Sequence, residues 1–106
     1  MPRSRREPPA SFSDNWPDRA CSDPAAEKVR LFVLRLRAAM GGASLRKTVA
    51  EVDLDYSILS DYLSGKTWPA SRAVAVLEVA LDQALWPPHV SREFATHEEP
   101  GQSVEG

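Results

Sequence analysis

The sequence predicts an all-α protein, a compact bundle of four or five short helices with flexible N- and C-terminal tails. Apolar residues recur at spacings of three and four throughout the middle of the chain, which is the period of an amphipathic helix. Helix-capping residues, glycine and proline separate these segments, and the break at residues 53–55 carries no hairpin signal. A chain of 106 residues holds one domain of ordinary size.

The first helix is predicted to begin at Asp23-Pro24, an N-cap residue followed by proline at the first helical position, and to end at Gly41-Gly42. Its inward residues are Val29, Phe32, Leu36 and Met40, and its solvated face carries Arg30, Arg35 and Arg37. A second helix of only two turns begins at Ser44, with Leu45, Val49 and Val52 on one face.

The third helix follows Asp55, whose carboxylate is expected to accept the free N–H groups, and it stops at Gly65. Its inward residues are Ile58, Leu59, Tyr62 and Leu63. The fourth begins near Ser71 and turns inward Val74, Leu77 and Leu81, while Ala73 and Ala80 allow neighbouring helices to approach. The sequence of residues 89–94 is compatible with a short fifth helix.

The chain divides into three parts by composition. Residues 1–22, rich in Pro, Ser and Arg, read as a flexible arm, although Phe12 and Trp16 could dock onto the domain. Residues 23–88 form the helical domain, and residues 89–106 are a short helix or a disordered acidic tail.

The net charge of −2 argues at first against a nucleic-acid partner, because such domains are usually basic. However, the tail holds one Arg against four Glu, whereas residues 24–88 hold eight basic against seven acidic side chains. The charge therefore does not exclude DNA, but it predicts modest non-specific affinity.

Several other functions have no support in the sequence. One Cys and two His supply no metal-ligand set, and no catalytic motif is present, so we expect a protein that is not an enzyme and has no metal or cofactor. No apolar run suits a signal peptide or a membrane span, so a cytoplasmic location without membrane contact is expected.

The second and third helices, joined by a short turn, have the spacing of a helix-turn-helix, in which the second helix enters the major groove of DNA. The run from Ser44 to Gly65, and above all Leu59-Ser60-Asp61-Tyr62-Leu63-Ser64-Gly65-Lys66 followed by Pro69, resembles the lambda-repressor/Cro-like (Cro/C1-type, XRE) family, especially its actinobacterial members. The resemblance covers about residues 27–82 and implies a lambda-repressor-like fold. Asp53 stands where the family commonly has a left-handed glycine, a conformation that Asp tolerates.

Four basic residues are candidate phosphate contacts. Arg46 and Lys47 lie in the first turn of the second helix, where cations oppose the helix dipole and would suit a nearby phosphate. The resemblance adds Lys66 and Arg72, whose matching positions touch the DNA backbone in the family. The alternative for all four is ordinary solvated charge.

The exposed side of the third helix supplies the candidate base contacts, Tyr56, Ser57, Ser60 and Asp61. Tyr56 and Ser57 open the helix, at the end that enters deepest. Tyr56 could instead pack over the preceding turn, Ser60 could contact phosphate or a neighbouring helix, and Asp61 would be repelled by phosphate unless it accepts from a cytosine amino group.

The resulting hypothesis is a sequence-specific transcriptional regulator, repressor-like, that binds double-stranded DNA as a homodimer on paired half-sites. The alternative is a protein-interaction adaptor or antitoxin-like module on the same fold, which the acidic residues around the third helix and in the tail favour. In either case Trp86, Phe94 or the acidic tail could contact a protein partner.

Overall fold

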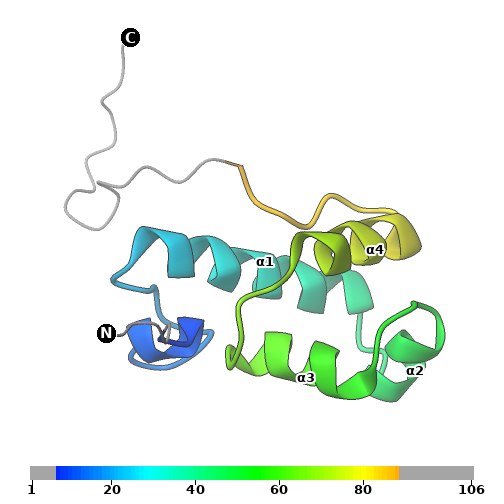
Figure 1. Cartoon of the computed structure of the whole chain (residues 1–106), viewed down its shortest axis with the longest axis horizontal. Helices are drawn as coiled ribbons and strands as arrows, with labels where there is room; N and C mark the ends of the chain where they lie inside the picture. Colours follow the sequence, from blue (N-terminus) through cyan, green and yellow to red (C-terminus); the bar gives the residue numbers. More distant parts are fainter. Residues whose placement is uncertain (1–6, 89–106) are drawn as a thin grey trace, which may run out of the picture.

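The computed structural model describes residues 7–88 and contains four α-helices and one short 3₁₀-helix within them (Figure 1). The elements are η1 (Pro9–Phe12), α1 (Pro24–Met40), α2 (Leu45–Ala50), α3 (Tyr56–Ser64) and α4 (Ser71–Leu81). The all-α prediction is confirmed for this part of the chain, whereas the suggested helix at residues 89–94 lies outside the described residues.

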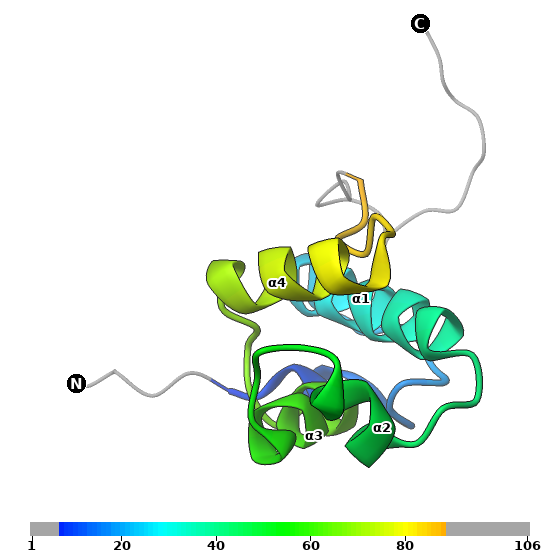
Figure 2. The same cartoon turned by 90° about the vertical axis from the view of Figure 1, so that its right-hand side faces the viewer.

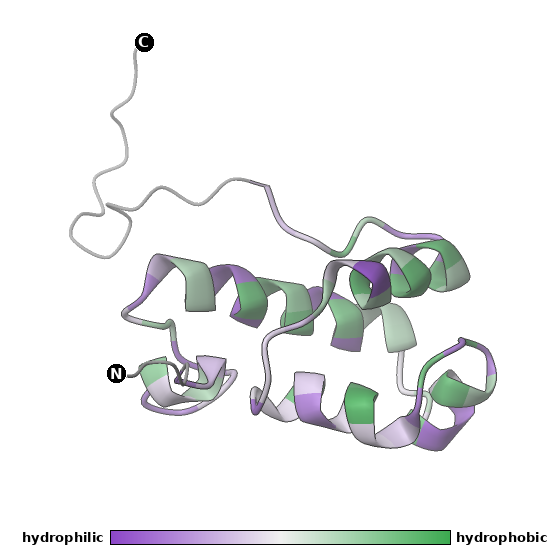
Figure 3. Ribbon diagram, in the orientation of Figure 1, coloured by the Kyte–Doolittle hydropathy of each residue, from purple (hydrophilic) through white to green (hydrophobic). Residues whose placement is uncertain are grey.

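The helices form two layers. In both views α1 and α4 lie together on one side, and α2 and α3 lie on the other (Figures 1 and 2). Between them is a core of fully buried side chains that α1, α3, α4 and the segment after α4 contribute: Val29, Phe32, Val33, Leu36, Leu59, Leu77 and Leu85. Most of α4 is hydrophobic in Figure 3, because Ser71, Arg72 and Glu78 are its polar residues.

Capping side chains and glycines set the helix ends largely as predicted. The Asp23 carboxylate accepts the Ala26 N–H at 2.9 Å, and the Ser44 hydroxyl accepts the Lys47 N–H at 3.0 Å. Gly41 and Gly65 end α1 and α3 in the left-handed conformation. Asp55 occupies the N-cap position of α3 without a side-chain hydrogen bond, so its predicted capping role is not observed.

Three other predictions about single residues were wrong. Ile58 is 37% exposed and Ala80 is exposed, because each lies beside rather than on the buried stripe of its helix. Asp53 does not adopt the left-handed conformation, and Asp82, which ends α4 at φ 55°, is the residue other than glycine that does so within residues 7–88. The chain leaves α2 instead through Glu51, whose φ and ψ remain in the right-handed helical region.

The N-terminal segment, defined as residues 7–22, belongs to the stretch that was predicted to be a flexible arm, and here the structure departs most from the prediction. It packs against α1 and the end of α3, and it buries Pro9, Pro17 and Cys21. The Trp16 indole N–H donates to the Leu63 carbonyl at 3.0 Å. The docking of Trp16 that the sequence left open is observed, because an aromatic ring buries a large area at a low conformational cost.

Two more hydrogen bonds join this segment to the loop after α3. The Ala10 N–H donates to the Gly65 carbonyl at 3.0 Å, and the Trp68 indole N–H donates to the Glu7 carbonyl at 2.8 Å. Gly65 is packed closely enough that a Cβ there would lie 2.6 Å from Trp16 Cε2. A side chain at this position is therefore disfavoured by both contact and backbone conformation.

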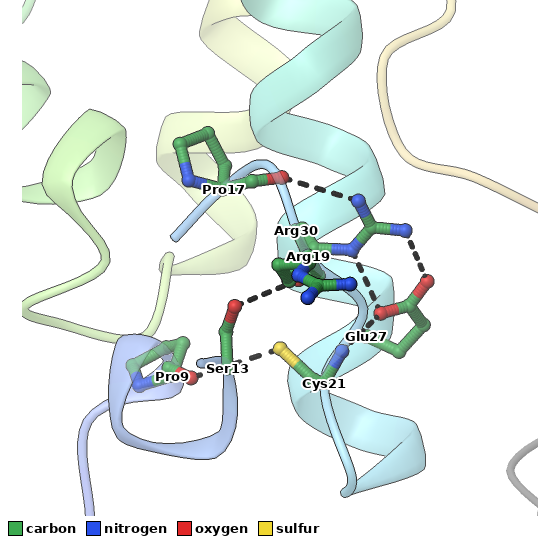
Figure 4. Close-up of polar contacts among 7 residues, drawn as sticks. All are labelled: Pro9, Ser13, Pro17, Arg19, Cys21, Glu27 and Arg30. Carbon is green, nitrogen blue, oxygen red and sulfur yellow. Dashed lines mark hydrogen bonds and ion pairs between the residues drawn. The ribbon is translucent and has the colours of Figure 1, made fainter. Parts of the chain in front are cut away.

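A polar cluster ties the same segment to α1 (Figure 4). The buried Glu27 carboxylate accepts the Cys21 N–H at 2.8 Å and pairs with both Arg30 Nε, at 2.8 Å, and Arg30 Nη2, at 2.6 Å. The guanidinium also donates to the Pro17 carbonyl at 3.1 Å. Arg30 was predicted on the solvated face of α1, but its side chain is 14% exposed, and these partners explain why burial is tolerated.

The cluster sets the ionisation of its members. Burial disfavours the Glu27 carboxylate, but hydrogen bonds from Arg30 and from the Cys21 N–H outweigh this effect and lower its pKa. Hydrogen bonding to Glu27 raises the pKa of Arg30. Burial, aided by the Glu27 charge, raises the pKa of the Cys21 thiol to about 11, so this thiol is protonated at neutral pH and is a poor nucleophile.

Candidate nucleic-acid interface

Four of the residues predicted to contact DNA lie at the starts of the second and third helices and are all exposed: Arg46, Lys47, Tyr56 and Ser57. We call these four side chains the α2–α3 surface. They come from the first turns of α2 and α3, which pack against each other. The Lys47 N–H is already bonded to the Ser44 hydroxyl and the exposed Asp55 directly precedes Tyr56, so the groups of this surface that could attract an anion are the side chains of Arg46 and Lys47.

Buried Thr48 and the half-buried Leu45 and Val49 orient α2 so that its cations face outward. The Thr48 hydroxyl donates to the Ser44 carbonyl at 3.0 Å, and Thr48 is only 3% exposed. Leu45 and Val49 pack against the core. In so short a helix these contacts leave the opposite face, which carries Arg46 and Lys47, open to solvent.

Arg46 and Tyr56 form a contact that joins the predicted phosphate and base contacts. The Arg46 guanidinium carbon lies 4.8 Å from the centroid of the Tyr56 ring, and Tyr56 is 43% exposed. The ring is therefore neither free nor packed away over the turn, but forms a platform under a cation. The sequence predicted separate roles for these residues. It did not predict their contact because ten positions separate them along the chain and they lie on different helices.

The remaining candidates on α3 are less accessible. Ser60 and Asp61 are half-buried, whereas Ser57 is exposed. Tyr62, predicted to belong to the core, is 6% exposed, and its hydroxyl accepts the Ala70 N–H at 3.2 Å. This bond fixes the start of α4 relative to α3.

Lys66 and Arg72 occupy different surroundings. Lys66 is exposed and lies directly after Gly65, where its backbone N–H donates to the Asp61 carbonyl at 3.0 Å. Arg72, at the start of α4, pairs with the Asp53 carboxylate at 3.6 Å, and both side chains are largely exposed, at 72% and 90%. Nineteen positions separate this pair, so no helical period could have predicted it.

A separate apolar cleft of about 420 Å³ lies between the start of α4 and the segment after it, and Pro69, Ser71, Val74 and Trp86 line it. Trp86 is 37% exposed, packs against Phe32 with ring centroids 5.6 Å apart, and has Lys28 Nζ 5.5 Å from its own centroid. Phe94, its predicted companion in a protein-binding patch, lies outside the described residues.

Glu78 positions this tryptophan. Its carboxylate accepts the N–H groups of Leu85 and Trp86 at 2.8 and 2.9 Å. These hydrogen bonds, that of Trp86 foremost, lower the pKa of Glu78. The chain after α4 thereby turns back so that Leu85 enters the core.

Within residues 7–88 no three His, Cys, Asp or Glu side chains converge as metal ligands. None of the helices described is long and apolar enough to cross a membrane. Comparison of the chain with protein-family models, with curated proteins and with solved structures found no match.

Proposed function

We propose that the protein is a sequence-specific DNA-binding regulator, repressor-like, in which α2 and α3 act as a helix-turn-helix. The observation that carries the proposal is the contact of Arg46 with Tyr56 on the exposed first turns of these helices. The contact holds Arg46, which can bind phosphate, beside Tyr56, which can contact a base edge.

In this proposal Arg46 and Lys47 bind backbone phosphate, and Lys66 supplies a further contact beyond the other end of α3. Tyr56 and Ser57 face the bases: the tyrosine ring suits a thymine methyl group, and the serine hydroxyl can donate or accept. The half-buried Ser60 and Asp61 have a smaller part. So few contacts predict a homodimer on two half-sites about one helical turn apart.

Selection from a random duplex library at moderate salt tests this proposal. Enrichment of a palindromic site is expected, with binding that weakens steeply as salt is raised. Ser57→Ala should relax the preference at one or two positions, whereas Arg46→Ala should weaken binding to all sequences, and Arg35→Ala, which removes an exposed arginine of α1, is the matched control. Absence of duplex binding at low salt would refute the proposal.

The Trp86 cleft favours a second candidate function, that of a protein-interaction adaptor or antitoxin-like module. Its lining is mainly apolar and includes a partly exposed tryptophan, a residue type enriched at the centres of protein interfaces. A protein partner whose binding is lost with Trp86→Ala and is indifferent to DNA would support this candidate over the first.

A further inference from the structure

The ion pair between Asp53 and Arg72 gives one of the predicted phosphate contacts a competitor. Asp53 lies in the connection between α2 and α3, three residues before Tyr56, whereas Arg72 opens α4. The pair therefore joins α4 to the edge of the α2–α3 surface. The contact is a single approach of Nη2 to Oδ2 at 3.6 Å, and a carboxylate at this distance competes with a phosphate for the charge of the guanidinium.

From this geometry we infer that Asp53 is an affinity-limiting residue, which withholds Arg72 from the DNA backbone. The inference rests on the proposed function and deepens it. While the pair is formed, the Asp53 carboxylate offsets the charge that Arg72 presents to a phosphate, so fewer counterions are displaced when DNA binds. Sequence-independent affinity is thereby kept low, and a larger share of binding depends on base contacts.

The exposure of both side chains makes the competition reversible. Solvent-exposed ion pairs are weak because water and salt screen them. A phosphate that approaches Arg72 can therefore displace the Asp53 carboxylate, but it must do so against the repulsion of that carboxylate. Asp53 lowers the affinity for DNA without abolishing the contact.

The test is a set of four proteins, the wild type, Asp53→Asn, Arg72→Gln and the double variant, titrated with random-sequence and selected duplexes over a fourfold range of salt. Asp53→Asn is expected to tighten binding to every duplex by about threefold at the lowest salt and to steepen the slope of log affinity against log salt by about one. In the Arg72→Gln background, Asp53→Asn should give no gain, because Asp53 acts through Arg72.

Asp82→Asn is the matched control. It removes the same charge at the opposite end of α4, about 15 Å from Arg72 along the helix axis, and asparagine accepts the left-handed conformation of this residue. Its affinity and salt slope should equal those of the wild type. Thermal unfolding should show that all variants remain folded.

The outcomes separate the two proposals. If the wild type binds but Asp53→Asn changes neither affinity nor slope, or if the gain persists without Arg72, the inference fails while the proposed function stands. If neither the wild type nor Asp53→Asn binds any duplex, both fail. Binding by Asp53→Asn alone would also overturn both, because the proposed function requires duplex binding by the wild type and the inference requires that Asp53 lower the affinity without abolishing it.

Discussion

The N-terminal segment with its anchor on α1 and the α2–α3 surface use charged and polar side chains in opposite ways. Glu27 and Arg30 satisfy each other, and they also bond the backbone of Cys21 and Pro17. In contrast, Arg46, Lys47 and Ser57 are exposed to solvent. A buried charge needs every partner to be present, whereas an exposed one remains available for a ligand. Paired polar groups therefore stabilise the contact of the N-terminal segment with α1, whereas the α2–α3 surface keeps its polar groups open to solvent.

The largest effect is expected from Glu27→Ala, which leaves the Arg30 guanidinium and the Cys21 N–H without their acceptor. Loss of one member of a buried pair is strongly destabilising, and since Arg30 keeps some solvent contact we expect a loss of about 3 kcal/mol in the free energy of unfolding. Urea denaturation measures it. Glu51→Ala, at an exposed position, should cost less than about 0.5 kcal/mol. Similar values for both variants would remove the contrast between the two regions.

Gly65→Ala tests the junction between the N-terminal segment and α3. The new Cβ would meet the Trp16 ring and Ala10, and the residue would keep a φ of 73° that alanine disfavours, so a loss of about 2–3 kcal/mol is expected. Gly42→Ala is the control, because φ there is 91° but no atom lies within 4 Å of the added Cβ. Its smaller cost in thermal unfolding would isolate the contribution of contact with Trp16.

Acid should lower the free energy of unfolding by weakening the contacts of the Glu27 carboxylate. The folded state lowers the pKa of Glu27 below its ordinary value of 4.5, so the stabilisation is present above that pH and is lost as the pH falls through the folded-state pKa. Glu78 adds to the same trend. The difference in free energy of unfolding between the wild type and Glu27→Gln should therefore shrink below about pH 4.5. A difference that is constant down to pH 3 would contradict this account.

The smallest effect on stability is expected on the α2–α3 surface. Ser57→Ala and Lys47→Ala remove exposed side chains and should change the free energy of unfolding by less than about 0.5 kcal/mol. Arg46→Ala should cost slightly more, because it removes the contact with Tyr56. If any of these variants were strongly destabilised, the surface would be part of the structural framework, and altered DNA binding could not be assigned to it.

Local chemistry made much of the helical domain predictable. Asp23, Ser44, Gly41 and Gly65 mark helix ends through hydrogen bonds and backbone conformations that depend on a few adjacent residues. The exposure of Tyr56 and Ser57 followed from the period of α3. Ile58 escaped prediction because a helix position next to the buried stripe becomes exposed or buried according to its neighbours, which periodicity does not include.

By itself, therefore, the sequence determined the four helices of residues 23–88, most of their boundaries and the polar residues that α2 and α3 present. Only the tertiary structure decided that the N-terminal segment packs on α3, that Arg30 is held against the Pro17 carbonyl, and that Asp53 meets Arg72. The physical reason is distance along the chain. Caps and periods act between residues a few positions apart, whereas these contacts join Trp16 to Leu63 and Asp53 to Arg72, and they exist only once the layers have packed.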